Sequence, residues 1–142
     1  MMKLQLTNWE VKGFWPGEPL WTKSVESTVQ RRGVTPWLPV TVPGGVHNAL
    51  LNAGLIADPD VGLNSLLCEW VEHRWWVFRT FFDTPNDGRR AFLRFDGIDD
   101  ECRILLNGEE IARHEGMYEP VLCDVTHLLR EGEKNQLLVI LM

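Results

Sequence analysis

The stretch ECRILLNGEEIAR, residues 101–113, carries the clearest structural signal in the chain. Cys102, Ile104 and Leu106 stand at every second position, as on one face of a strand. Asn107-Gly108 then predicts a two-residue turn of the primed type, in which both central residues need a positive φ. The stretch is therefore predicted to form a β-hairpin.

A second strong pattern precedes the hairpin. Residues 74–83, RWWVFRTFFD, are rich in β-branched and aromatic side chains and end at a turn sequence. Both faces of such a strand are apolar, so we expect both to be covered by other parts of the protein. The two faces carry Trp76, Phe78 and Phe82, and Trp75, Val77 and Phe81, respectively.

Weaker patterns supply further strands. RAFLRFDG, residues 90–97, places Ala91, Leu93 and Phe95 on one face, and KLQLTNW, residues 3–9, alternates at its leucines. About eight short strands at close spacing indicate an all-β sandwich. The other predicted strands are 38–42, 65–70, a strand within 119–129 that runs into a helical turn, and 136–142.

One short helix interrupts this pattern, in VPGGVHNALLNAGLIADPD, residues 42–60. Its apolar residues fall at i, i+3, i+4 and i+7, which predicts a helix of about two turns. Gly54 fits the end of that helix, and Asp58-Pro59 indicates a turn. The apolar stripe consists of Val46, Ala49, Leu50 and Ala53.

Composition narrows the class of protein. The chain has 142 residues, which favours one domain, and a net charge of −6, which disfavours a nucleic-acid partner. No apolar run is long enough to span a membrane, and the N-terminus lacks the apolar core of a signal peptide. If Met1 is the native start, we expect a cytoplasmic protein.

Motifs of catalytic or metal sites are missing from the sequence: there is no GxSxG, GxGxxG, Walker loop or HExxH. The four histidines are scattered and the three cysteines widely spaced, so we expect no metal, no cofactor and free, buried thiols. Seven tryptophans stand against one tyrosine. Tryptophan rings stack on sugars but also fill cores and interfaces, and both interpretations stay open.

Four stretches, in this order, resemble the N-terminal domain of family 2 glycoside hydrolases, and among these the β-mannosidases. The resemblance runs from Trp37 to the last residue. The stretches, each followed in parentheses by the family pattern that it resembles, are WLPVTVPGGVHNALLNAGLIADP (VPG turn, VH..LL helix, AGLI.DP), EWVEHRWWVFRTFF (W...WVYR..F), LRFDGIDDECRILLNGEEIARHEGMYEP (L.F.GLDT.A.V.LNG) and DVTHLLREGEKNQLLV (DVT.LL..G.N.L.V).

The resemblance implies a galactose-binding-domain-like jelly-roll β-sandwich that packs against a catalytic (β/α) barrel of the same polypeptide. Residues 1–142 are then one jelly-roll domain, truncated at its C-terminus, with the barrel absent. Such enzymes remove terminal β-linked sugars, here mannose, with retention of configuration, through two glutamates of the barrel. No residue of this chain is therefore assigned a catalytic role, and the predicted helix is interpreted as scaffolding at one end of the sandwich.

Substrate contact is predicted for the loop from Asp58 to His73, with Trp70 as a stacking platform and Asn64 and Glu69 as partners for sugar hydroxyls. Glu69 and Glu72, three apart on a predicted strand, would face opposite sides and form no acid/base pair.

Two alternatives stay open, a stand-alone carbohydrate-binding module and a protein-interaction sandwich. Because the chain ends on an apolar strand, we also expect an exposed strand edge and self-association of the isolated chain.

Overall fold

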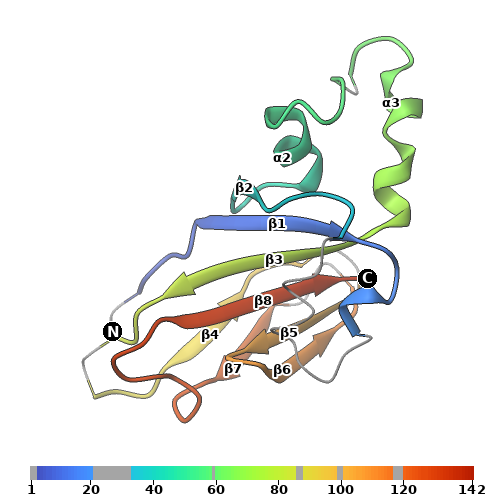
Figure 1. The fold of residues 1–142 in the computed structure, drawn as a ribbon. Coiled ribbons are helices and arrows are strands. Elements are labelled where there is room, and N and C mark those ends of the chain that lie inside the picture. The colour runs from blue at the N-terminus through green and yellow to red at the C-terminus, as the bar shows by residue number, and fades with distance from the viewer. Residues whose placement is uncertain (1–2, 21–32, 59, 86–87, 99–100, 117–119) are drawn as a thin grey trace.

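Eight strands in two antiparallel sheets form the fold (Figure 1), within the residues that the computed structural model describes: 3–20, 33–58, 60–85, 88–98, 101–116 and 120–142. The large sheet has the order β2-β1-β3-β8-β5-β6, and the small one pairs β4 with β7. The predicted all-β class is confirmed. The strands are β1 Asn8–Phe14, β2 Leu38–Thr41, β3 Trp75–Phe82, β4 Phe92–Phe95, β5 Cys102–Leu106, β6 Glu109–His114, β7 Val121–Asp124 and β8 Asn135–Leu141.

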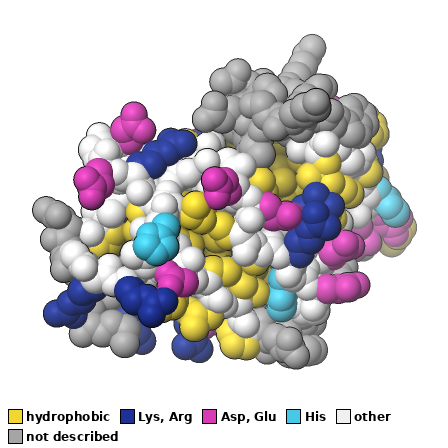
Figure 2. All heavy atoms as spheres, turned by 90° about the horizontal axis from the view of Figure 1, so that it is seen from below, with side chains coloured by type: hydrophobic (Ala, Val, Ile, Leu, Met, Phe, Trp, Pro, Cys, Tyr) yellow, Lys and Arg dark blue, Asp and Glu magenta, His cyan; other side chains and the backbone are white. Residues whose placement is uncertain are grey.

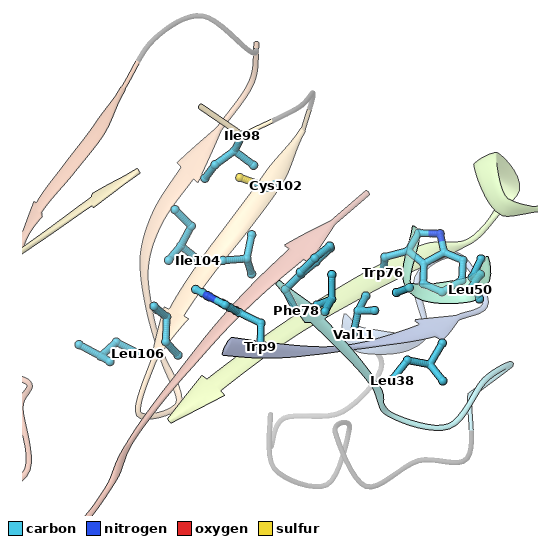
Figure 3. Packing of buried hydrophobic residues seen from close by; sticks show 14 of the residues in the cluster. Trp9, Val11, Leu38, Leu50, Trp76, Phe78, Ile98, Cys102, Ile104 and Leu106 are labelled. Atoms are coloured by element: carbon cyan, nitrogen blue, oxygen red, sulfur yellow. The ribbon is translucent and has the colours of Figure 1, made fainter. Parts of the chain in front are cut away.

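The core lies between the two sheets. Alternate residues of the large sheet point to the same side, where their side chains pack together (Figure 3). The small sheet adds one face of each strand, Leu93 and Phe95 from β4 and Val121 and Cys123 from β7. Ala91 packs against the same cluster, so the predicted apolar face of residues 90–97 is confirmed. The labelled core residues are Trp9, Val11, Leu38, Leu50, Trp76, Phe78, Ile98, Cys102, Ile104 and Leu106.

A smaller cluster covers the other face of the large sheet. It consists of buried residues from β1, β3, β5 and β8, with Trp37, Trp75 and Met142 packed against it. The prediction that β3 is covered on both faces is therefore confirmed for most of its length. It is wrong for Phe81, which is 49% exposed near the end of the strand. The buried members are Phe14, Val77, Leu105, Leu138 and Ile140.

The predicted helix is α2, Val46–Asn52. Ala49 and Leu50 are 2% and 0% exposed and join the main core, so the helix packs down onto the sandwich. Gly54 has a φ of +73° and stops the helix. The amides of Gly54 and Leu55 donate to the carbonyls of Leu51 and Leu50, at 3.0 and 2.9 Å, which is the Schellman arrangement.

Residues 65–70 do not form the predicted strand. The chain makes two short helical turns there, α3 (Asn64–Leu67) and the 3-10 helix η2 (Glu69–His73); a further 3-10 turn, η1, spans Glu18–Leu20. A short apolar run does not distinguish a strand from a helix by its pattern alone. Glu69 and Glu72 consequently lie on the same side of η2, since residues three apart eclipse in a 3-10 helix.

The two chain ends also differ from expectation. Strand β1 starts only at Asn8, and Leu4 is 63% exposed instead of lying on a strand face. Strand β8 pairs with β3 on one side and with β5 on the other. The prediction of an exposed strand edge at 136–142 is therefore wrong. The prediction of self-association was based on that edge and loses its support.

A buried amide joins three connections at one end of the large sheet. Asn135 is 0% exposed, and its Nδ2 donates to the Phe82 carbonyl and to Thr84 Oγ1, at 3.2 and 2.9 Å. Its Oδ1 accepts from Asn107 Nδ2 at 3.0 Å and from the Arg130 amide at 2.8 Å. The side chain thus links the end of β3, the β5–β6 turn and the β7–β8 connection.

Replacing Asn135 with alanine is expected to destabilise the protein by about 2–4 kcal/mol, because several buried polar groups lose their partners at once. Urea unfolding followed by circular dichroism measures the change. The control is Glu133→Ala, two residues away and exposed. Equal midpoints for the two variants would show that water replaces the amide without cost.

The Asn107-Gly108 turn has the predicted geometry, with φ of +52° at Asn107 and +86° at Gly108. Gly108→Val is expected to cost about 1–3 kcal/mol, because a β-branched residue resists a positive φ. No atom lies within 4 Å of an added Cβ, so the cost is one of backbone strain alone. Glu109→Val, the next residue but in a strand, is the control in the same unfolding measurement; equal losses would contradict the strain argument.

Candidate functional site

The predicted contact residues Asn64, Glu69 and Trp70 lie on one excursion of the chain, residues 54–73, here called the arm. The arm leaves the end of α2, turns through α3, and returns through η2 into β3. Figure 1 shows it projecting away from the sandwich beyond β1 and β2. The structure therefore brings the three candidates together on one projecting element.

The base of the arm is anchored in the core. Cys68 and Val71 are each 3% exposed, and the Cys68 thiol lies 3.7 Å from the Ala57 carbonyl on the outgoing half of the arm. Trp76 of β3 donates its indole N–H to the Val71 carbonyl at 2.9 Å. These contacts hold η2 against the large sheet, so the arm is a packed element with a fixed base.

The three candidates differ in what they offer a ligand. Asn64 begins α3 and is half-buried, and Glu69 begins η2 and is exposed. Trp70 is half-buried, with its ring centroid 6.2 Å from that of Trp76 at an interplanar angle of 45°. Part of the Trp70 ring is thus used in packing, and its role as a sugar platform stays a prediction.

Another tryptophan, Trp15, is more exposed than Trp70, and it was not named as a contact candidate from the sequence. Trp15 follows β1 and is 50% exposed, with the Arg74 guanidinium stacked 4.0 Å from its ring centroid. Trp9 and Trp76 are buried, as the packing interpretation predicts, and Trp21 lies outside the described residues. The sequence signal for Trp15 was its place in a Pro- and Gly-containing loop, which favours exposure.

Acidic residues elsewhere in the fold have structural partners. Asp124 Oδ1 accepts from the hydroxyl and amide of Thr126 at 2.6 and 3.1 Å, and its Oδ2 pairs with Arg90. The Thr126 hydroxyl and the Arg90 guanidinium together hold the pKa of Asp124 well below its usual range. A general acid for glycoside cleavage needs a raised pKa, so Asp124 is unsuited to that role.

The cysteines and histidines offer no reactive centre. All three thiols are free, as expected, but only Cys68 and Cys102 are buried; the expectation of a buried thiol is wrong for Cys123, which is half-buried. Desolvation raises the pKa of Cys102 and of Cys123, which keeps them protonated. Among the described residues, no three His, Cys, Asp or Glu side chains gather closely enough to hold a metal ion. The helices of the described ranges are all too short or too polar to cross a membrane.

Two shallow hollows open on the surface, of about 250 and 240 Å³, and neither includes a candidate contact residue. The first lies at the open end of the β5–β6 hairpin and is lined by Arg103, Arg113 and His114 among others. The second lies between β2 and α2. The arm is thus a projecting surface with no enclosed pocket of its own among these hollows.

Taken together, the two-sheet sandwich and its projecting arm define a galactose-binding-like jelly-roll domain. The chain belongs to the glycosyl hydrolase 2 galactose-binding domain-like family, whose model matches residues 21–142. The resemblance to family 2 glycoside hydrolases inferred from the sequence is therefore confirmed.

Relatives with this domain are much longer proteins. The β-mannosidase B of Thermothelomyces thermophilus is 40% identical over 106 residues, which cover 72% of this chain and 12% of the relative. The β-mannosidase of Rattus norvegicus is 36% identical over 97 residues, 66% of this chain and 11% of the relative. The crystal structure of a β-D-mannosidase from Dictyoglomus thermophilum superimposes with a TM-score of 0.81 at 34% identity, covering 100% of this chain and 16% of that one.

The contacts at the base of the arm lead to a prediction for Gly13 of β1. A Cβ at Gly13 would come within 2.7 Å of the Trp76 ring, the same ring that holds Val71 and contacts Trp70. Gly13→Ser is therefore expected to displace this ring, to cost about 1–3 kcal/mol by overpacking, and to change the tryptophan emission. Gly45→Ser is the control, because its Cβ meets open space and serine suits the N-cap position that Gly45 occupies before α2. Equal emission and stability in both variants would show that Trp76 yields freely.

Proposed function

We propose that this chain is the non-catalytic, sugar-binding-like domain of a retaining exo-glycosidase that removes terminal β-linked mannose. The observation that carries the proposal is the likeness to β-mannosidases, which spans about two thirds or more of the chain in two curated relatives and all of it in a solved structure. These relatives share the domain at 34–40% identity, well above the level at which only the fold is common.

Catalysis belongs to another part of such an enzyme. Retaining hydrolysis needs two carboxyl groups about 5–5.5 Å apart, one with a raised pKa that protonates the leaving group. Here the carboxylates of Glu10, Asp83 and Glu110 form ion pairs with Arg or Lys side chains, and the pKa of Asp124 is lowered. We propose that the two catalytic carboxyl groups lie on a (β/α) barrel carried by the same polypeptide, and that this barrel is the partner of the domain.

The arm is the part of the domain that we propose to reach the substrate. An amide at Asn64 and a carboxylate at Glu69 suit the hydroxyls of a neutral sugar, since both groups accept hydrogen bonds and the amide also donates. Binding residues tend to lie on loops that a rigid scaffold holds in place. The buried contacts of Cys68 and Val71 provide such a scaffold directly beside Glu69 and Trp70.

The test uses a chimaera in which this chain replaces the matching region of the Thermothelomyces enzyme. We expect the chimaera to hydrolyse p-nitrophenyl β-mannoside and the 142-residue chain alone to show no turnover above a vector control. Asn64→Ala in the chimaera is expected to raise KM about three- to tenfold, the value of one hydrogen bond between uncharged groups, and Glu69→Gln at least as much, because a hydroxyl bonds more strongly to a carboxylate. Glu133→Gln, exposed on the β7–β8 connection, is the matched control.

Different outcomes would overturn different parts of this proposal. Turnover by the isolated chain would place the catalytic carboxylates within residues 1–142. A folded chimaera without mannosidase activity would remove the mannoside assignment. Unchanged KM in both arm variants would remove Asn64 and Glu69 from the substrate site while leaving the enzyme class intact.

A further inference from the structure

The tip of the arm exposes large hydrophobic side chains close together. On and just before α3, Leu63, Leu66 and Leu67 are 76%, 58% and 69% exposed. They stand at i, i+3 and i+4, so the latter two lie beside Leu63 along one helical turn. Leu55 and Val61 on the outgoing half of the arm are 47% and 58% exposed. Single exposed leucines are ordinary, but a gathered apolar surface marks an interaction site.

The segments on both sides of these leucines are packed into the core. Cys68, directly after α3, is 3% exposed, and Val71 one turn later is buried and bonded to the Trp76 indole. Leu50, before the arm begins, is fully buried in the core. The chain therefore enters and leaves the arm through packed residues, and the exposed side chains belong to a supported element.

Charge distinguishes among possible partners. From residue 54 to residue 72 the charged side chains are four acids, and none is a lysine or arginine. All four of these acids are exposed. A second copy of the chain would bring like charges to the same contact, which disfavours it. The acids are Asp58, Asp60, Glu69 and Glu72.

Elsewhere the surface is more mixed. The face shown in Figure 2 interleaves hydrophobic side chains with Lys, Arg, Asp, Glu and His side chains. The arm, in contrast, exposes leucines and four acids and has no Lys or Arg, which fits an apolar hollow bordered by basic residues. Relatives of the chain carry this domain as 11–16% of their length, so a large further body of polypeptide accompanies it in those proteins.

We propose that the arm is the docking element of the domain, and that its leucines insert into an apolar hollow with a Lys/Arg border on the catalytic domain of the same polypeptide. This inference rests on the proposed function and adds to it the surface through which the domain acts. Docking of the leucines also brings Asn64, which lies among them, to the catalytic domain.

Hydrogen exchange read by mass spectrometry tests the docking in the wild-type chimaera and in the 142-residue chain. Peptides covering residues 61–67 are expected to exchange about tenfold more slowly in the chimaera, because docking covers α3. The triple variant Leu63→Ser, Leu66→Ser, Leu67→Ser is expected to lose that protection. When the same three changes are made in the isolated chain, the unfolding midpoint is expected to stay close to that of the wild type, because these side chains are exposed.

The control removes exposed hydrophobic residues from another surface. Phe92 and Leu122, on β4 and β7, are 51% and 65% exposed, and Phe92→Ser with Leu122→Ser is expected to keep the protection of the arm. A second variant, Leu63→Lys, places a charge at the most exposed of the three leucines. This single change is expected by itself to lower the protection of residues 61–67 from hydrogen exchange in the chimaera.

Equal exchange of residues 61–67 in the chimaera and the isolated chain would overturn the docking proposal, even if the chimaera hydrolyses mannosides. Concentration-dependent protection of the arm in the isolated chain, with a dimer in sedimentation velocity, would assign the surface to a second copy and overturn it as well. A chimaera that protects the arm but lacks mannosidase activity would support docking and contradict the proposed function.

Discussion

One buried side-chain amide holds together the end of the sandwich where three connections meet. Asn135 uses both amide hydrogens and its carbonyl oxygen in bonds to the end of β3, to the β5–β6 turn and to the connection that precedes β8. Asn107 extends the network, because its Oδ1 accepts from the Gln136 amide and its Nδ2 donates to the Leu128 carbonyl. These bonds fix the point at which the central strand β8 enters the sheet, and β8 then pairs with β3 on one side and with β5 on the other.

The motifs that revealed the family mark this scaffold. The LNG motif supplies Asn107, and the motif that begins with DVT ends at the Asn135 region; the two asparagines meet although 28 residues separate them. Thr126 of DVT donates to and accepts from the backbone of Ala91, which fixes β7 beside β4. The fold was predictable from sequence because these motifs occur in order along the chain, and the residues named here satisfy buried backbone and amide groups that need hydrogen-bond partners.

The parts that sequence reasoning missed depend on contacts between distant segments. The position of β8 between β3 and β5 is a matter of strand order. The apolar run Leu137, Leu138 and Val139 indicates a strand but does not say which strands it pairs with. The helical turns of the arm follow from anchoring Cys68 and Val71 to the core, because the run of leucines itself suits either a helix or a strand. The candidate residues Asn64, Glu69 and Trp70 were chosen for the irregular, polar-aromatic composition of their segment; the structure places them on the arm, and their contact with a sugar stays a prediction.

Trp76 makes the core and the arm one unit. Its ring packs over Gly13 inside the sandwich, and its indole N–H bonds to the Val71 carbonyl at the foot of the arm. The base of the arm, from which α3 projects, is therefore positioned by the packing of a core residue. A domain built in this way can present an apolar tip to another domain at a fixed position, because the energy that orients the tip is already supplied by the core. Binding residues work only when rigid support holds them to about half an ångström, and the contacts of Trp76 give the base of the arm such support.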